Sequence, residues 1–344
     1  MEPRDAAKLL VFRRETGQIT HHIVRDLPDL LRPTDLLVFN DTRVLRARLR
    51  GFKPSGGRVE ALLLKEIAPN CWQALLKPSA RLRNGTSVEF VSLEGTLHIA
   101  ALLVERADEA WILQFSPPQG ADIRDFLPVL GEVPLPPYIR QSSSGLRYQT
   151  TFSRQKTDGN PLDSAAAPTA GLHFTPELLE NLRNRGIESA FLTLAVGAGT
   201  FRPVQSETLE EHRMHREEFE ISAQTAQKIN AQKARGGRVV AVGTTSVRAL
   251  ESVADARGQV APGEAATQIF IRPGHAFRSV DALLTNFHQP RSTLLALVAA
   301  FIEAGTENGE NGSKSGLATI REIYAHAMEN DYRFHSFGDA MLLD

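Results

Sequence analysis

The stretch RVVAVGTTSVRALESVADA, residues 238–256, carries the clearest fold signal in the sequence. It begins with a run of apolar residues, passes through Gly243 and three hydroxyl residues, and continues with apolar residues at helical spacing. A buried strand that turns directly into a helix is the repeating unit of α/β domains. We therefore expect an α/β domain whose helices cover a sheet.

The same alternation of strands and helices surrounds this stretch. TPELLENLRNRG is predicted to be a helix, because Thr175 suits the N-cap, Pro176 the first turn and Gly186 the C-terminal stop, with leucines on one face. Further helices are expected at 26–31, 292–304 and 317–330, and strands at 8–24 around a Thr16-Gly17 turn, 35–40, 187–196, 268–271, 282–287 and near Tyr332.

The pattern differs between Val44 and Pro118. This region holds only short strand-like runs separated by turn residues, with no segment of helical period, which is typical of an all-β barrel or sandwich. Because alternating strands and helices are predicted on both sides of this region, we expect a discontinuous α/β domain of residues 1–44 and 119–344. A small all-β barrel of residues 45–118 is inserted in it.

Composition excludes several classes of protein. The chain has 344 residues, a formal net charge of −1 and one cysteine, so it has no internal disulfide framework and no cysteine-rich zinc site. Its longest apolar run, LLALVAAFI, is too short to span a bilayer, and charges stand where a signal peptide would be apolar. We expect a cytoplasmic enzyme that does not bind membranes.

A run of basic residues lies at the start of the β-rich region. Arg46, Arg48 and Arg50 alternate with apolar residues, so a strand would place them on one face, and Arg43 and Lys53 extend the run without an intervening acid. Guanidinium groups bind phosphates in bidentate fashion. An edge strand that uses charge to prevent pairing would have the same pattern, and composition favours neither interpretation.

Two glycine-containing loops follow predicted strands. The loop after Gly243 lies where open α/β sheets bind ligands, and Thr245 or Ser246 could cap the helix; it lacks the Gly-Lys-Ser/Thr ending of a P-loop. AVGAGTFRPV has Gly197 and Gly199 but no third glycine, so it indicates close ligand approach rather than a nucleotide fingerprint.

Histidines are candidates for proton transfer. His212 and His215 are three residues apart and could share a helix face, but without a third ligand at a recognisable spacing hydrogen bonding or proton transfer is favoured over metal binding. His288 precedes the predicted N-cap Ser292, and His173 follows a loop of small residues. Each alone could equally be structural.

Taken together, the strings DLLVFNDTRVLRARL, PLPPYIR, RYQT, AAPTAGLHFTPELL, VGAGTFRPV, VGTTSVRALES, TNFHQPRSTLLALVAAF and YRFHSFGDAMLL resemble the S-adenosylmethionine:tRNA ribosyltransferase-isomerase family of queuosine biosynthesis. The resemblance covers nearly the whole chain. It implies an α/β domain with an inserted small β-barrel. It also implies transfer and isomerisation of the ribosyl group of S-adenosylmethionine onto 7-aminomethyl-7-deazaguanine in the tRNA anticodon, giving epoxyqueuosine-tRNA, adenine and methionine.

The resemblance also implies the partners. The substrates would be S-adenosylmethionine and the tRNAs for tyrosine, histidine, asparagine and aspartate, and the enzyme would be a monomer. S-adenosylmethionine would be a consumed cosubstrate, so neither a metal nor another cofactor is expected.

The reaction needs a base near C5′ of the ribose and a proton donor at the leaving adenine. The family usually has histidine where this chain has Ala195. His173 is therefore the leading acid–base candidate. The other catalytic candidates are His215, His288 and Asp339.

The resemblance further implies two sets of binding residues. Those expected to bind S-adenosylmethionine are Thr169, Ala170, Gly171, Gly197, Gly199, Gly243, Thr244, Thr245 and Asn286. Those expected to contact tRNA phosphates are Arg43, Arg46, Arg48, Arg50 and Lys53.

Two other functions compete with this interpretation. An S-adenosylmethionine-dependent RNA methyltransferase would keep the adenosine intact, and a non-catalytic RNA-binding module would need only the barrel and the arginines. Mass spectrometry for free adenine and a modified nucleoside distinguishes the three.

Overall fold

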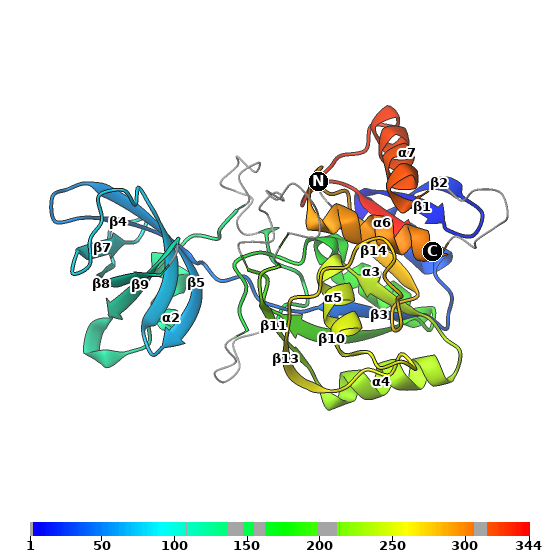
Figure 1. Ribbon diagram of the computed structural model, residues 1–344, viewed down its shortest axis with the longest axis horizontal. Helices are drawn as coiled ribbons and strands as arrows, with labels where there is room; N and C mark the ends of the chain where they lie inside the picture. The colour runs from blue at the N-terminus through cyan, green and yellow to red at the C-terminus, as the bar shows by residue number, and fades with distance from the viewer. Residues whose placement is uncertain are drawn as a thin grey trace. The chain divides into compact units, whose positions relative to one another are not determined.

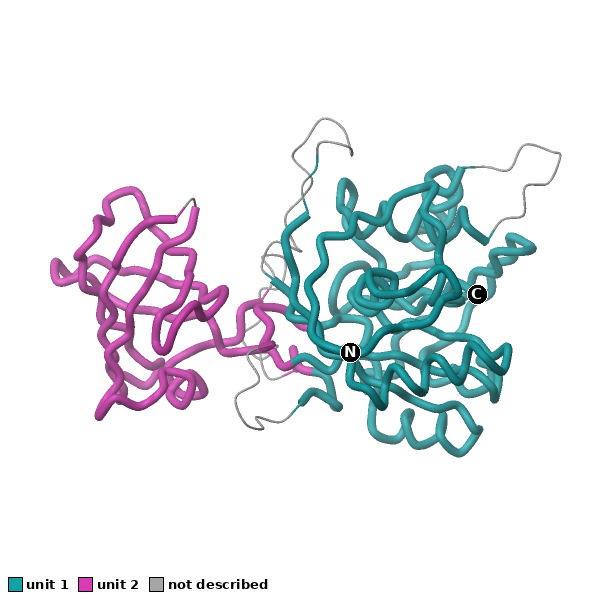
Figure 2. Tube along the Cα trace, turned by 60° about the horizontal axis from the view of Figure 1, so that its bottom comes forward, with its two compact units in different colours: residues 1–42, 150–155, 168–344 teal, residues 43–149, 156–167 magenta. Residues whose placement is uncertain are grey.

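The computed structural model describes residues 3–107, 109–135, 147–154, 162–197, 212, 214–305 and 315–344. The chain divides into two compact units (Figure 2). Unit 1 contains Met1–Thr42, Thr150–Gln155 and Pro168–Asp344, and unit 2 contains Arg43–Gln149 and Lys156–Ala167.

Unit 1 is built on a mixed sheet of nine described strands (Figure 1). In spatial order they are β13 (Gly263–Thr267), β11 (Glu217–Ile221), β10 (Glu188–Leu194), β3 (Leu36–Asn40), β12 (Val239–Val242), β14 (Ala282–Asn286), β15 (Ala340–Leu343), β1 (Lys8–Arg13) and β2 (Gln18–Ile23). The four central strands β10, β3, β12 and β14 are parallel. Their carboxyl ends therefore meet at one edge of the sheet.

The order of these strands reverses at β3. The chain moves from β3 to β10 on one side, and later to β12 and β14 on the other. Because crossovers between parallel strands are right-handed, connections that run in opposite directions place their helices on opposite faces. The described helical segments of unit 1 are η1 (Arg4–Ala6), η2 (Val24–Asp26), α1 (Leu27–Leu30), η5 (Thr169–His173), α3 (Pro176–Asn184), α4 (Ala223–Ala234), α5 (Thr244–Val253), α6 (Thr293–Gly305) and α7 (Gly316–Glu329).

One face of the sheet packs against α1, α3 and η5. Leu37 and Phe39 of β3 share a buried apolar cluster with Leu178 and Leu182 of α3. The ring of Phe39 meets that of Phe174 edge to face at 4.8 Å between centroids. This cluster fixes η5 against the sheet close to the carboxyl ends of the strands.

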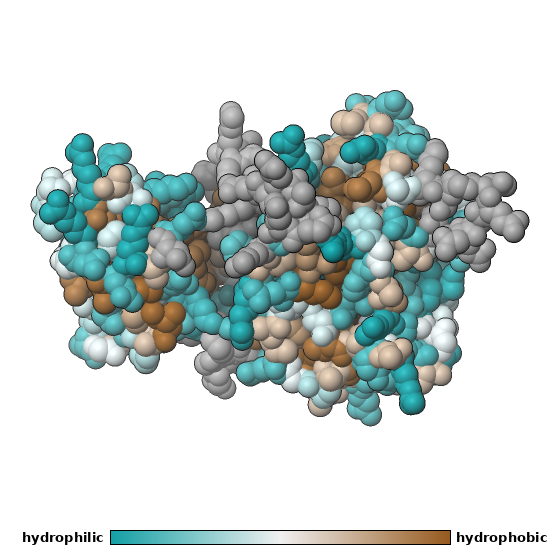
Figure 3. Space-filling view, in the orientation of Figure 1, coloured by the Kyte–Doolittle hydropathy of each residue, from teal (hydrophilic) through white to brown (hydrophobic). Residues whose placement is uncertain are grey.

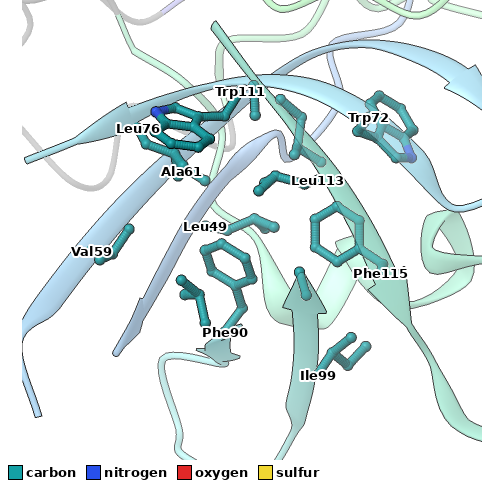
Figure 4. Packing of buried hydrophobic residues seen from close by; sticks show 14 of the residues in the cluster. Leu49, Val59, Ala61, Trp72, Leu76, Phe90, Ile99, Trp111, Leu113 and Phe115 are labelled. Atoms are coloured by element: carbon teal, nitrogen blue, oxygen red, sulfur yellow. The ribbon is translucent and has the colours of Figure 1, made fainter. Parts of the chain in front are cut away.

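Unit 2 contains a closed barrel of six described strands, all antiparallel. Around the barrel they are β4 (Arg48–Phe52), β5 (Arg58–Ala68), β6 (Cys71–Lys77), β9 (Ala110–Ser116), β8 (His98–Ala107) and β7 (Ser87–Val91). Alternate residues such as Leu49, Phe90 and Leu113 point inward and fill the barrel (Figure 4). The period-two pattern of the sequence follows from this alternation.

A short helix belongs to the barrel core. After η3 (Pro118–Gly120), α2 (Ile123–Leu130) buries Ile123, Leu127 and Leu130 in the same apolar cluster as the barrel strands. Asp122 caps this helix by accepting a hydrogen bond from the backbone N–H of Arg124 at 2.8 Å. Unit 2 therefore continues beyond residue 118, where the strand pattern in the sequence ends.

The predicted fold class is confirmed, an α/β domain with a small inserted barrel. The helix predicted from residue 175 is also confirmed, because Thr175 Oγ1 accepts the backbone N–H of Leu178 at 3.1 Å and Gly186 adopts a φ of +82° beyond its end. The hairpin that turns at Gly17 and the cap at Ser292 are observed as well. Each of these signals is local in sequence.

Other predictions were wrong. The segment 268–271 follows β13 and is not a strand, and the last strand begins at Ala340, not near Tyr332. Residues 212 and 214–216 are not helical, so His212 and His215 do not share a helix face. The N-cap of α5 is Gly243, with no side-chain cap from Thr245 or Ser246.

Candidate active site

The candidate site lies at the carboxyl edge of the parallel strands in unit 1. Asn40 ends β3, Gly243 follows β12 and Asn286 ends β14. Open α/β sheets bind ligands at the carboxyl edge where the strand order reverses, which here lies between β3 and β12. Asn40 and Asn286 are buried at 1% and 2% exposure, so their amides are placed to bond neighbouring groups rather than water.

Asn40 joins the ends of three strands. Its Nδ2 donates to the carbonyl of Leu194 at 3.1 Å and lies 3.4 Å from Thr245 Oγ1. Its Oδ1 accepts the backbone N–H groups of Leu194 and Thr42 at 3.0 and 3.1 Å. Both ends of the amide are therefore occupied, and Asn40 holds the loops at the switch point in place.

Gly243 brings the backbone close to η5. Its φ of +91° is strained for any residue with a Cβ, and a Cβ built there would lie 3.6 Å from that of Ala170. Thr244 and Thr245 form the first turn of α5, whose N–H groups have no partners within the helix. The predicted residues Ala170, Gly243, Thr244 and Thr245 thus come together.

Thr169 and Asn286 connect η5 to β14. Thr169 Oγ1 donates to Asn286 Oδ1 at 2.8 Å, and Asn286 Nδ2 donates to the carbonyl of His335 at 3.4 Å. Gly171 is packed tightly, since a Cβ there would lie 2.9 Å from the Phe152 ring. Gly197 lies just beyond β10, where no described residue comes within 4 Å of the place a Cβ would take, and Gly199 lies outside the described residues.

His173 is buried between two backbone carbonyls. Its Nδ1 is 3.2 Å from the oxygen of Ala170, and its Nε2 is 3.1 Å from that of Gly338. Burial lowers the pKa of His173, although the two carbonyls oppose that effect. A neutral imidazole has one N–H and can donate to only one carbonyl, so the second nitrogen faces an oxygen until the ring takes up a proton.

Asp339, next to Gly338, is fully buried and ionised. Its oxygens accept the backbone N–H of Lys8 at 2.8 Å and that of Arg333 at 2.7 Å, and the Arg333 guanidinium at 2.6 Å. Burial would raise the pKa of Asp339, but the hydrogen bonds from Arg333 and Lys8 hold it below its usual value. This arrangement fits an anchor better than a proton carrier.

The other two histidines lie in different surroundings. His288 Nε2 is 3.0 Å from Thr285 Oγ1, and its backbone N–H donates to Tyr324 Oη at 2.9 Å. Burial, with a smaller contribution from His335, lowers the pKa of His288 to about 4, so the ring is neutral at pH 7. His215 is exposed just before β11 and contributes no buried contact to the site.

Sequence reasoning missed Asp41. This side chain is 8% exposed, accepts a hydrogen bond from Thr193 Oγ1 at 2.7 Å and lies 3.3 Å from Arg154 Nε. Burial raises the pKa of Asp41, although Thr193 and Arg154 oppose the rise. The signal was available, because a carboxylate directly after a buried strand of an α/β pattern points to the ligand edge.

The predicted phosphate contacts belong to unit 2. Arg48 and Arg50 share the outer face of β4 around buried Leu49, as predicted, whereas Arg46 lies before the strand begins. Neighbouring elements supply acids that the sequence run lacks: Arg48 pairs with Glu60 at 2.8 Å and Arg50 with Glu132 at 2.7 Å. Such exposed pairs contribute little stability.

The remaining members of this set differ in exposure. Arg46 is exposed and donates to the carbonyl of Pro128 at 2.7 Å, whereas Arg43 and Lys53 are half-buried. Phe52 lies on the same face of β4 as Arg50 and is 43% exposed, a residue type on which unpaired bases stack. The face of unit 2 in Figure 3 likewise mixes hydrophilic and apolar residues.

The described residues show neither a candidate metal cluster nor a candidate membrane span. They contain no cluster of three or more histidine, cysteine, aspartate or glutamate side chains that could hold a metal ion. None of their helices is both long and apolar enough to cross a bilayer.

Comparison with known proteins shows the family. The family model described as queuosine biosynthesis protein matches residues 1–343. Proteins named S-adenosylmethionine:tRNA ribosyltransferase-isomerase from a Methylobacterium species and from Thermus thermophilus are each 48% identical, over 100% of this chain and 93% and 94% of their own lengths. The crystal structure of S-adenosylmethionine tRNA ribosyltransferase from Thermotoga maritima is 34% identical with a TM-score of 0.52, covering 100% of this chain and 94% of that one. The chain therefore belongs to the S-adenosylmethionine:tRNA ribosyltransferase-isomerase family, enzymes of queuosine biosynthesis that act as transferase-isomerases.

Proposed function

We propose that this chain transfers and isomerises the ribosyl group of S-adenosylmethionine onto the aminomethyl group of 7-aminomethyl-7-deazaguanine in tRNA. The products are epoxyqueuosine-tRNA, adenine and methionine, and the tRNAs are those for tyrosine, histidine, asparagine and aspartate. S-adenosylmethionine is a consumed cosubstrate. The observation that carries the proposal is the convergence of small residues, buried amides and acid–base groups at the switch point between β3 and β12.

The nucleoside of S-adenosylmethionine binds along η5 and the loop after β12. Thr169, Ala170 and Gly171 present mainly backbone, and Gly243 has no side chain to obstruct a ligand. The N–H groups of the first turn of α5, which have no partners within the helix, suit the ribose hydroxyls or ring nitrogens. Asn286 accepts a hydrogen bond from Thr169 and so holds η5, the proposed wall of the nucleoside site, in position.

His173 is the proposed base at C5′, beside the sulfonium. Protonation replaces a contact between a nitrogen lone pair and a carbonyl oxygen with a second hydrogen bond, which favours proton uptake despite burial. Gly338 orients the ring from the Nε2 side, and Ala170 belongs to the nucleoside wall, so we assign proton uptake to Nδ1, whose contact with the Ala170 carbonyl opens when C5′ approaches. Asp41, whose pKa is raised by burial, is the proposed donor to the leaving adenine.

The outer face of β4 in unit 2 holds the tRNA in this proposal. Arg46, Arg48 and Arg50 supply phosphate contacts together with Arg43 and Lys53, and exposed Phe52 offers a surface for an unpaired base. Glu60 and Glu132 hold two of these guanidiniums in extended positions until phosphate displaces them.

The function is tested by incubating the protein with S-adenosylmethionine and tRNA that bears the aminomethyl deazaguanine. Mass spectrometry should find free adenine and epoxyqueuosine in equal amounts. Formation of S-adenosylhomocysteine would identify a methyltransferase instead. Binding of the tRNA without any small-molecule product would identify an RNA-binding module.

The role of His173 is tested with His173→Gln, whose amide can still donate to one carbonyl. Adenine release should fall by about 10²- to 10⁴-fold, the usual contribution of a positioned base, while tRNA affinity stays unchanged. His22→Gln on β2 is the matched control, because it removes a half-buried histidine away from the carboxyl ends of β3 and β12. Turnover of His173→Gln at the control rate would remove His173 from the mechanism.

A further inference from the structure

Arg248 is a buried guanidinium with an uncommitted nitrogen. It lies on α5, one turn beyond Thr244, and is 4% exposed. Its Nη1 pairs with the carboxylate of Glu217, and its Nε donates to the carbonyl of Ile269 at 3.4 Å. Its Nη2 is buried and has no hydrogen-bond partner among the described residues.

The strand topology places this guanidinium at the edge that holds the candidate site. Glu217 begins β11, which runs antiparallel to β10, and the backbone N–H of Ala195 donates to the carbonyl of Glu218 at 2.9 Å. Ile269 follows the carboxyl end of β13, where Thr267 is registered with Glu217. The side chain of Arg248 therefore reaches from α5 to the carboxyl end of β10.

An orphaned donor on a buried charge is unfavourable, and native proteins seldom retain one without a function. The free nitrogen of a guanidinium held by two partners is preorganised for a carboxylate. Glu217 pairs with Arg248, so a simple carboxylate would place a second acid on one guanidinium. An α-amino acid brings its own ammonium with its carboxylate and so adds no net charge.

We propose that Arg248 binds the α-carboxylate of the methionine moiety of S-adenosylmethionine, with Glu217 and Ile269 holding the guanidinium in position. This inference rests on the proposed function and adds to it a subsite for the amino-acid tail. It makes Arg248 a binding residue, and it predicts that the enzyme discriminates among sulfonium nucleosides by the presence of that carboxylate.

The test compares S-adenosylmethionine with decarboxylated S-adenosylmethionine by calorimetry. The two ligands share the nucleoside, the sulfonium and the amine, and differ only in the carboxylate. The wild-type protein should bind S-adenosylmethionine about 10- to 100-fold more tightly, the range of a charge-assisted hydrogen bond. Equal binding of the two ligands by the wild type overturns this inference alone, whereas binding of neither removes the proposed function as well.

Two variants locate the effect. Arg248→Lys keeps the charge but lacks the second nitrogen, and Arg248→Met/Glu217→Gln removes both charges so that neither is left buried alone. Both should bind decarboxylated S-adenosylmethionine as the wild type does, and both should lose the preference for S-adenosylmethionine. Because the wild-type comparison needs no variant, a folding defect does not leave the proposal untested. An intact preference in the folded double variant would overturn it.

Discussion

Acid should destabilise unit 1 through His288. Burial holds the pKa of its folded-state ring at about 4, whereas an unfolded histidine titrates at its ordinary value of 6.5. The unfolded chain therefore binds a proton more readily than the folded one between these two values. The stability that depends on neutral His288 is complete above pH 6.5 and is lost as the pH falls towards 4.

The size of the effect follows from the two pKa values. At about 1.4 kcal/mol for each pH unit, the full difference corresponds to about 3.4 kcal/mol. Part of this is reached by pH 5, and the side chain is partly exposed, so water reduces the penalty. The two pKa values alone give about 2 kcal/mol between pH 7.5 and pH 5, and with partial exposure we expect the wild type to lose between about 1 and 2 kcal/mol through this residue.

The assay is urea unfolding of the wild type and of His288→Asn, which keeps a polar group beside Thr285 but does not titrate. Circular dichroism at 222 nm follows the helices, of which α3 to α7 all lie in unit 1. Tryptophan fluorescence follows unit 2, because the chain's two tryptophans, Trp72 and Trp111, lie on barrel strands. In the helix signal, His288→Asn should lose about 1 to 2 kcal/mol less than the wild type between pH 7.5 and pH 5. In the fluorescence signal, the variant and the wild type should lose equal amounts. An identical pH dependence of the helix signal in both proteins would refute the reasoning.

Two further predictions concern unit 2. Gly131→Ala should lower the free energy of unfolding followed by tryptophan fluorescence by about 2 kcal/mol or more, because the added Cβ would collide with the backbone carbonyl of Arg46; an unchanged urea midpoint would contradict the packing there. Arg46→Gln/Lys53→Gln should weaken tRNA binding equally for all tRNA sequences and reduce the slope of log affinity against log salt by about 2; an unchanged slope would exclude these two side chains as phosphate contacts.

The fold could be predicted where its determinants are close in sequence. The helix α3 was readable because Thr175, Pro176 and Gly186 mark its ends within twelve residues. The barrel was readable because inward and outward residues alternate along each strand, as in β6 and β7. Both signals depend on short-range backbone geometry, which the residue types dictate directly.

Predictions failed where distant partners decide the outcome. Apolar residues at 268–271 suggested a strand, but Ile271 is buried within a loop. Tyr332 suggested a strand for the same reason, whereas its ring packs against Phe287 at 5.5 Å between centroids. Buried positions favour apolar residues whether or not the backbone joins a sheet. Composition alone therefore cannot distinguish a buried loop from a strand.

Part of the site could also be predicted from short-range signals. Glycines and hydroxyl residues that follow predicted strands indicated the ligand edge, because open α/β sheets bind ligands at the carboxyl ends of their strands. The arginine run was readable as a face of β4, but Glu60 and Glu132, which pair with it, become neighbours only when the barrel closes. The ion pair between Arg248 and Glu217 joins residues 31 positions apart in the sequence, and no motif around either residue predicts it.

The proposed base is oriented by carbonyls rather than by a carboxylate. Gly338 contacts His173 from the segment whose Asp339 is tied to Lys8 on β1, so the ends of the chain position the ring. Asp339 is the nearest acid along this segment, yet the Arg333 guanidinium compensates its charge. An imidazolium formed at His173 would therefore rely on the two carbonyl dipoles and on an Asp339 charge that Arg333 opposes, which disfavours a long-lived cation in a buried site. Such a residue suits a proton that is taken from C5′ and passed on within the same turnover.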